Sequence, residues 1–159
     1  MKYFLDTEFI EDPRIAIQLI SIGIVAEDGR ELYLVSNEFD EFWANDWVKE
    51  HVLPKLIDPQ FRVSKQTIKE KILEFVGDDK PIFWGYFSDY DWVVFCQLFG
   101  KMVDLPKGWP MFCLDLKQSM FERRISKDSL PPQSKYAHHA LADASWIEQA
   151  HEIVYKENQ

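Results

Sequence analysis

The sequence has few or none of the features that mark secreted and membrane proteins. It contains only two cysteines, Cys96 and Cys113, which are too few for a disulfide framework and favour free thiols in a reducing compartment. No apolar run approaches the roughly 20 residues of a membrane span, and the N-terminal stretch carries an acid, Asp6, where a secretion signal would be apolar. We therefore expect a cytoplasmic protein without a membrane partner.

The chain also has no surplus of basic side chains, and its net charge is −9. Proteins that bind long nucleic acids through their phosphates usually carry a basic footprint. The charge is uneven, however, since the segment 101–135 has seven basic and four acidic residues, a net charge of +3 against −12 for the rest of the chain. This segment is either an ordinary solvated surface or a local surface for phosphates.

The chain has 47% hydrophobic and 15% aromatic residues, which is enough for the core of one domain. We expect this domain to cover residues 1–159. Residues 2–36 read as a three-stranded antiparallel meander with an Asp-Gly turn. The order of elements predicts an α/β fold, a mixed sheet of three antiparallel strands and then parallel strands, flanked by helices. Helices are expected over 42–54, 64–77, 89–100 and 137–156, and further strands over 81–87 and 111–116.

The stretch YFLDTEFI, residues 3–10, carries the first functional signal. Asp6 and Glu8 lie two apart in a predicted strand, so they share one face at a separation of roughly 6–7 Å, and Thr7 and Phe9 face the other way. Two like charges among apolar neighbours are costly unless a cation balances them. A divalent metal would provide that balance.

Two further acids stand where they can join this pair. Asp91 lies at the first turn of the helix after strand 81–87, and Asp143 interrupts the last helix beside small residues. Functional groups of an open α/β sheet gather at strand ends and adjoining helix starts, so we expect all four carboxylates to converge. An oxygen-rich set selects Mg²⁺ or Mn²⁺, and a pair of such cations is a known solution for phosphodiester chemistry.

Several acids also have purely structural interpretations. Asp91 could be a helix N-cap and Asp143 a solvent-facing helical residue. We interpret Asp89 as an N-cap and Asp115, near another predicted strand, as a structural or surface residue. Asp6, together with Glu8, fits such an interpretation poorly because its neighbours are apolar.

The stretch HHALAD, residues 138–143, offers a histidine that titrates near neutrality and suits general base catalysis. On a continuous helix His139 shares a face with Asp143, whereas His138 diverges from it by about 140°. His138 becomes the candidate if the helix begins only near Ala140, because it then lies on the preceding loop. Spacing alone favours His139.

Taken in order, these residues resemble the three motifs of the DEDDh group of 3′–5′ exonucleases, which have a ribonuclease-H-like fold. The family pattern of Asp-x-Glu, then Asp, then His-x4-Asp matches Asp6 with Glu8, Asp91, and His138 with Asp143. The surrounding YFLDTEFIED, HVLPKL and CQLFG are similar to a small stand-alone exoribonuclease type of mycobacteria and other bacteria. The resemblance spans nearly the whole chain.

The resemblance implies a 3′–5′ exoribonuclease that releases nucleoside monophosphates from RNA 3′ ends, prefers RNA over DNA, uses two Mg²⁺ or Mn²⁺ ions and forms a homodimer. It implies that Asp6 bridges both metals, while Glu8 and Asp143 complete the site of the metal that activates water. It further implies that Asp91 holds the second metal and that His138, rather than His139, is the general base.

Substrate contacts have less support. Thr7 and Phe9 flank the acids and are candidates for contact with the terminal nucleotide, Phe9 by base stacking. The basic stretch 117–135 precedes His138 and would bring cations to the phosphates. Its candidates for these contacts are Arg123, Arg124 and Lys127.

Other functions stay open from the sequence. The same site would serve a DNA-directed exonuclease, an endonuclease or a small-molecule phosphodiesterase, and the acidic surface favours short substrates over long ones. A different class of function is that of an inactive domain that binds nucleic acid or protein, although all the motif residues are present. Release of mononucleotides one at a time would identify an exonuclease.

Overall fold

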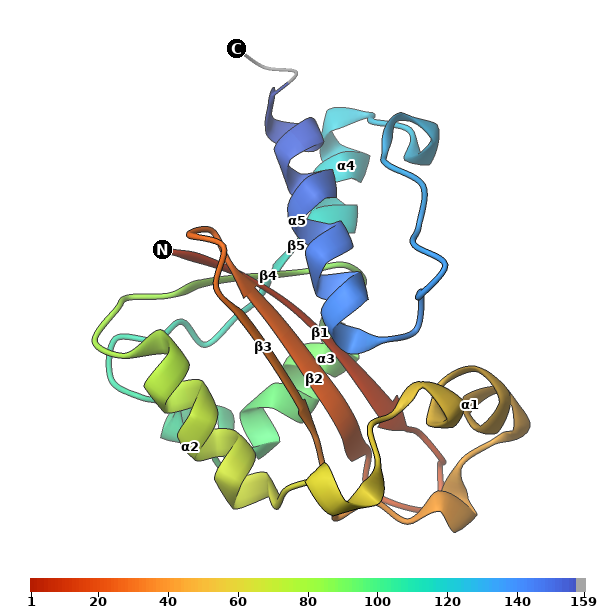
Figure 1. Ribbon diagram of the computed structural model, residues 1–159. Coiled ribbons are helices and arrows are strands. Elements are labelled where there is room, and N and C mark those ends of the chain that lie inside the picture. The colour runs from red at the N-terminus through yellow and green to blue at the C-terminus, as the bar shows by residue number, and fades with distance from the viewer. Residues whose placement is uncertain (157–159) are drawn as a thin grey trace.

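The computed structural model describes residues 1–156 and contains one five-stranded sheet with the order β3-β2-β1-β4-β5 (Figure 1). The pairs β1–β2 and β2–β3 are antiparallel, and β1–β4 and β4–β5 are parallel, which confirms the predicted mixed sheet. The predicted domain runs on to residue 159, and its last three residues lie outside the described ones. The strands are β1 (Lys2–Ile10), β2 (Gln18–Ala26), β3 (Glu31–Val35), β4 (Ile82–Gly85) and β5 (Leu114–Asp115).

Helices cover both faces of the sheet, as Figure 1 shows. Helices α2 and α3 pack on one face, α4 and α5 pack on the other, and α1 packs against the ends of β1 and β2. None of these helices is long and apolar enough to cross a membrane. The helices are α1 (Asp46–His51), α2 (Lys65–Val76), α3 (Asp89–Gln97), α4 (Leu116–Arg123) and α5 (Ala140–Lys156).

The alternation of β1 decides which of its side chains face which helices. Leu5 is buried in the core with α2 and α3, and Phe4 is buried in the core with α4 and α5. Asp6 and Glu8 continue the face of Phe4, whereas Thr7 continues the face of Leu5. The paired acids therefore point toward the start of α5, as their spacing predicts.

Two elements differ from the expectation because side-chain caps start helices at other positions. The helix expected over 42–54 is reduced to α1, since Asn45 accepts the backbone N–H of Val48 and begins the helix there. The strand expected over 111–116 has only two residues, because Asp115 caps α4. Helix α4 occupies the first part of the basic stretch 117–135.

The start of α5 is set by its contact with the sheet. The helix begins at Ala140, three residues later than expected, because His138 has a left-handed backbone with φ 66° that a helix excludes. A Cβ placed on Gly23 of β2 would overlap the backbone of Ala140 and Leu141. Only glycine permits so close an approach, so Gly23 determines where the loop and the first turn with Asp143 lie.

We predict that Gly23→Ala lowers the free energy of unfolding by about 2–3 kcal/mol, because the added methyl group meets backbone that cannot move aside cheaply. It should also speed amide exchange in the first turn of α5. A matched control is Ile24→Val, a fully buried neighbour facing the opposite core, which should cost about 0.5–1.5 kcal/mol without faster exchange in α5. Urea unfolding and hydrogen exchange measure both effects, and unchanged exchange in the Gly23 variant would contradict the prediction.

Candidate active site

A cavity of about 230 Å³ opens beside the second half of β1, where the sheet meets the start of α3 and the loop before α5. Every residue of the three sequence motifs lines it. These residues are Asp6, Glu8, Asp91, His138 and Asp143, and the other lining residues are Thr7, Phe9, Tyr86, Gln133, Trp146 and Ile147. The structure therefore brings together motif residues that lie up to 137 positions apart.

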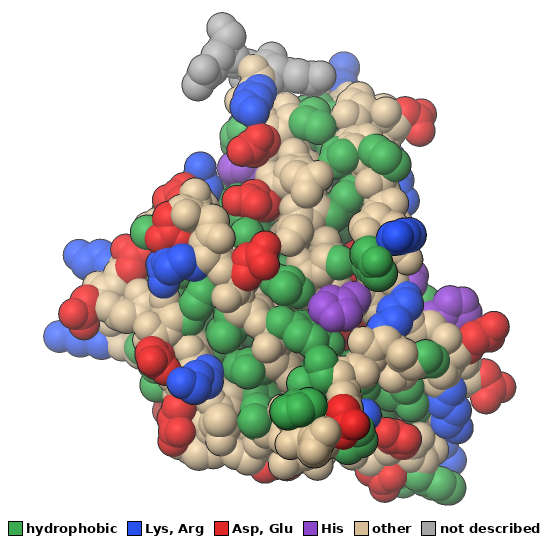
Figure 2. Space-filling model, in the orientation of Figure 1, with side chains coloured by type: hydrophobic (Ala, Val, Ile, Leu, Met, Phe, Trp, Pro, Cys, Tyr) green, Lys and Arg blue, Asp and Glu red, His purple; other side chains and the backbone are tan. Residues whose placement is uncertain are grey.

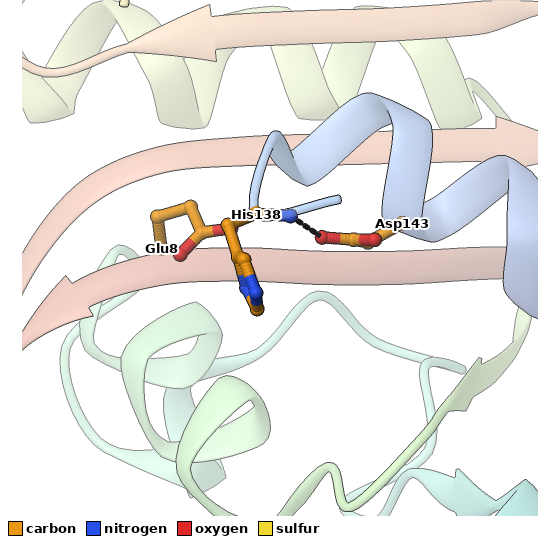
Figure 3. A group of neighbouring side chains, drawn as sticks. All are labelled: Glu8, His138 and Asp143. Carbon is orange, nitrogen blue, oxygen red and sulfur yellow. Dashed lines mark hydrogen bonds between the residues drawn. The ribbon is translucent and has the colours of Figure 1, made fainter. Parts of the chain in front are cut away.

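Three of these residues lie close enough to share one ion. Glu8, His138 and Asp143 each offer a ligand atom, and the three atoms lie within 4.8 Å of one another. Figure 3 shows Glu8 reaching in from β1, Asp143 from the first turn of α5, and His138 from the loop before that helix. The backbone N–H of His138 donates to Oδ2 of Asp143 at 2.7 Å, the dashed line in Figure 3. Asp143 thus fixes the loop that carries the histidine.

Asp91 reaches the cavity from the opposite face of the sheet. It lies in the first turn of α3 and is only 7% exposed. Its Oδ1 accepts hydrogen bonds from the backbone N–H of Thr7 at 2.8 Å and from the Thr7 hydroxyl at 2.6 Å. Thr7, predicted as a substrate contact, thus positions Asp91, and its contact with a nucleotide stays a prediction.

Burial raises the pKa values of all four acids, and neighbouring acids add to the increase at Asp6 and Glu8. Burial, followed by the charges of Asp91, Glu8 and Asp143, raises the pKa of Asp6 well above its usual range. Burial and then Asp143 raise the pKa of Glu8 to about 8. Burial raises the pKa of Asp91 to about 6, although the bonds from Thr7 lower it. Burial also raises the pKa of Asp143. Such a cluster holds negative charge that protein groups leave poorly balanced.

This donor set fits divalent cations. The ion pairs found within residues 1–156 include none of the four acids of the cavity. Carboxylate oxygens are the ligands that Mg²⁺ and Mn²⁺ prefer, and a bound ion is often the largest charge in such a site. Asp6, Glu8, Asp91 and Asp143 are the residues that would hold them.

Lys55, which sequence reasoning did not single out, brings positive charge to the site. It lies in the short 3-10 turn after α1, and its Nζ donates to the carbonyl oxygen of Ala137. Burial raises the pKa of Glu8 and of Asp143, and the charge of Lys55 opposes both increases. Lys55 therefore holds the residue before His138 and also lies in the field of the acids.

The two neighbouring histidines have different surroundings. His138 lines the cavity, with its ring centroid 4.6 Å from that of Trp47 on α1. Burial lowers its pKa, so the imidazole is neutral and able to accept a proton at neutral pH. His139 instead stacks on Tyr33 of β3, with ring centroids 4.2 Å apart. The structure thus favours His138 over His139 as the residue beside the acids.

The predicted phosphate contacts lie elsewhere. The guanidinium of Arg123 is 4.2 Å from the ring centroid of Tyr155, near the far end of α5. Twelve residues of helix separate Tyr155 from Asp143, about 18 Å along the axis. Arg124 follows the last residue of α4 and Lys127 begins the next turn, and none of the three basic residues lines the cavity. A contact with RNA at some other point stays a prediction for them.

Asp115 is a structural residue, as interpreted from the sequence. Its Oδ1 accepts the N–H of Gln118 at the start of α4, and its Oδ2 accepts the N–H of Ser88 before α3, both at 2.8 Å. The interpretation of Asp89 was wrong, because it is the first residue of α3 and follows Ser88 at the N-cap position.

We predict that Glu8→Gln stabilises the protein at high pH in EDTA. The unfolded parent loses this proton near the ordinary pKa of 4.5, whereas the folded state keeps it up to about pH 8. The parent's free energy of unfolding therefore falls as pH rises between these values, and the advantage of the variant grows. Urea unfolding at several pH values measures this. Glu74→Gln is a control of opposite sign, since Lys71 lowers the pKa of Glu74, and parallel curves for parent and Glu8→Gln would contradict the prediction.

The sequence has relatives among known proteins. A family model described as the 3′–5′ exoribonuclease Rv2179c-like domain matches residues 1–155. The protein named 3′–5′ exoribonuclease Rv2179c, from Mycobacterium tuberculosis, is 46% identical over 149 residues, which cover 91% of this chain and 87% of the relative.

The fold is similar to solved exonuclease I structures. Exonuclease I from Methylocaldum szegediense matches with a TM-score of 0.69 at 16% identity, over 99% of this chain and 40% of that one. The zinc-bound complex of E. coli exonuclease I with single-stranded DNA matches with a TM-score of 0.66 at 14% identity, over 99% and 41% of the two chains. The chain thus spans about two fifths of these structures, which confirm the ribonuclease-H-like fold. By its family match and its mycobacterial relative, the chain belongs to the Rv2179c-like 3′–5′ exoribonuclease domain family.

Proposed function

We propose that the protein is a metal-dependent 3′–5′ exoribonuclease that releases nucleoside monophosphates from RNA 3′ ends. The observation that carries this proposal is the convergence of Asp6, Glu8, Asp91, His138 and Asp143 on one cavity. Membership of an exoribonuclease family supports the reaction class, and the names of the family and of its mycobacterial member support RNA over DNA.

The acids divide into two groups around Asp6. Glu8 shares the face of Asp6 and lies near Asp143, and Asp91 approaches from the other face through its bonds to Thr7. This arrangement supports a site in which Asp6, Glu8, Asp91 and Asp143 would hold two Mg²⁺ or Mn²⁺ ions. When bound, such ions lower the pKa of water and neutralise charge at the leaving oxygen.

His138 has the properties of a general base for the attacking water. Its imidazole is half-buried, has a lowered pKa and lies beside the carboxylates of Glu8 and Asp143. The left-handed backbone at His138, the bond from its N–H to Asp143 and the contact of Lys55 with Ala137 hold it in place. Proton transfer from a positioned water needs this kind of fixed geometry.

The cavity suits the last nucleotide of a strand rather than a long duplex. Phe9 lines it and stacks on Tyr90, with ring centroids 5.9 Å apart, and so offers an aromatic surface near the acids. On the face that Figure 2 shows, Lys and Arg side chains are interspersed with Asp and Glu, which provides little long-range attraction for RNA. The cytoplasmic location expected from the composition stays a prediction, and so does the homodimer implied by the sequence resemblance.

The first test uses RNA and DNA oligonucleotides of one sequence, labelled at the 5′ end, with Mg²⁺, with Mn²⁺ and with EDTA. We expect a ladder that shortens from the 3′ end, faster on RNA and absent in EDTA. Asp6→Asn should abolish cleavage, and His138→Ala should lower kcat by about 10²–10⁴-fold. His139→Ala is the matched control and should stay active, because this residue packs on Tyr33. Internal cuts, or intact RNA with the parent protein, would sink the exonuclease proposal.

We further predict that Lys55→Met separates metal binding from turnover. Removing a positive charge near Glu8 and Asp143 should tighten Mn²⁺ binding, measured by calorimetry. Losing the contact with Ala137 should lower kcat at saturating metal by on the order of 10- to 100-fold. Lys55→Arg keeps the charge and should preserve both values more closely. Weaker Mn²⁺ binding in Lys55→Met would mean that the charge of Lys55 does not compete with the metal for these acids.

A further inference from the structure

A second hollow lies beside the cavity, between the β4–α3 turn and helix α4. Its volume is about 340 Å³, and neither the sequence motifs nor the proposed mechanism uses it. We call it the α4 groove. It is lined by Phe87, Asp89, Asp115, Lys117, Gln118 and Phe121.

Two phenylalanines of the α4 groove are held toward solvent. Phe87 is 64% exposed and Phe121 is 81% exposed. Phe87 also has a left-handed backbone with φ 56°, which is unusual for a bulky residue and costs free energy. Burial of the ring does not offset that free-energy cost, because most of the ring is outside the core. Such an arrangement marks a surface that binds something.

The α4 groove adjoins the cavity through neighbouring aromatic rings. The ring of Phe87 is 4.8 Å from the ring of Tyr86, and Tyr86 lines the cavity together with Asp6. Tyr86 in turn lies 5.1 Å from Trp146, another residue of the cavity wall. A strand whose last nucleotide occupies the cavity would therefore meet Phe87 after passing Tyr86.

The chemistry of the α4 groove suits bases and a phosphate. Nζ of Lys117 lies 5.9 Å from the ring centroid of Phe87, so a cation stands next to an aromatic surface. The carboxylate of Asp115 is already engaged by the N–H groups of Ser88 and Gln118. Asp89 is the remaining acid, and it lies exposed on the rim at the first turn of α3. Aromatic rings with a nearby cation are the usual means of holding single strands.

We propose that the α4 groove binds single-stranded RNA immediately 5′ of the terminal nucleotide. Bases would stack on Phe87 and Phe121, and Lys117 would contact the phosphate between them. The inference rests on the proposed function, since it assumes an RNA 3′ end in the cavity. Its position beside the cavity favours RNA over a protein as the occupant. Stacking of this kind is tolerant of sequence, so the enzyme would select single-stranded tails rather than particular bases.

The test compares a single-stranded RNA decamer with the methyl ester of uridine 5′-monophosphate, which has the scissile phosphodiester but no base 5′ of it. Phe87→Asn removes the ring but keeps a residue that tolerates the left-handed backbone, and Phe121→Ala removes the second ring. Each should raise the ratio of the decamer KM to the methyl ester KM by about fivefold, as expected for one weakened stack. Lys117→Ala should raise the decamer KM and reduce its dependence on salt, whereas Asp89→Asn should lower that KM.

The matched control is Phe61→Ala, which removes a phenylalanine that is 65% exposed in a turn remote in sequence from the α4 groove. It should leave the KM ratio unchanged. If the parent degrades RNA but the Phe87 and Phe121 variants keep the parental ratio, the inference fails and the groove is left for a protein partner. If the parent degrades no RNA, the proposed function fails, and anisotropy of a labelled decamer in EDTA then tests the groove alone. Equal affinity for parent and variants in that measurement would overturn the inference.

Discussion

The burial of four carboxylates around one short segment of β1 is the constraint on which the site depends. Asp6 and Glu8 share a face of the strand, and Asp91 and Asp143 approach from helices on opposite faces. Their raised pKa values show that the protein gathers these acids at a cost in free energy. Short hydrogen bonds hold the two helical acids, one from Thr7 and one from the loop before α5. A ligand that binds the folded state and neutralises these charges would raise the free energy of unfolding.

The two hydrophobic cores supply the stability that this cluster costs. Both faces of the sheet are covered, and apolar side chains of β1 below the acids are fully buried. The cores also fix geometry, because α5 can approach β2 only where Gly23 lacks a side chain. A close-packed interior transmits small displacements, so a shift of α5 on the sheet would move Asp143 and His138 together. Stability and arrangement of the site are thus linked through one helix–sheet contact.

Local patterns predicted the parts of the site that depend on local geometry. The two-residue period of a strand was enough to place Asp6 and Glu8 on one face. His138 was harder, because helical spacing favoured its neighbour and the real helix start depends on contacts with β2 and Lys55. Lys55 left no signal of its own, since its partner lies 82 residues away. The place of Arg123 on a helix could not be predicted, because α4 has only two buried apolar residues and therefore a weak helical period.

An acidic protein that acts on RNA must replace long-range attraction with contacts at short range. At −9 the net charge repels phosphates at a distance, but salt confines that repulsion to about 8–10 Å. Within this range the groups that the proposed function relies on are the acids of the cavity, the aromatic rings near them and single cations such as Lys117. Stacking on rings does not depend on charge, so it can hold a strand where a basic surface is absent. It also requires bases that are free of pairing, so the proposed function, carried out on an acidic surface, would favour short or single-stranded 3′ ends over long duplexes.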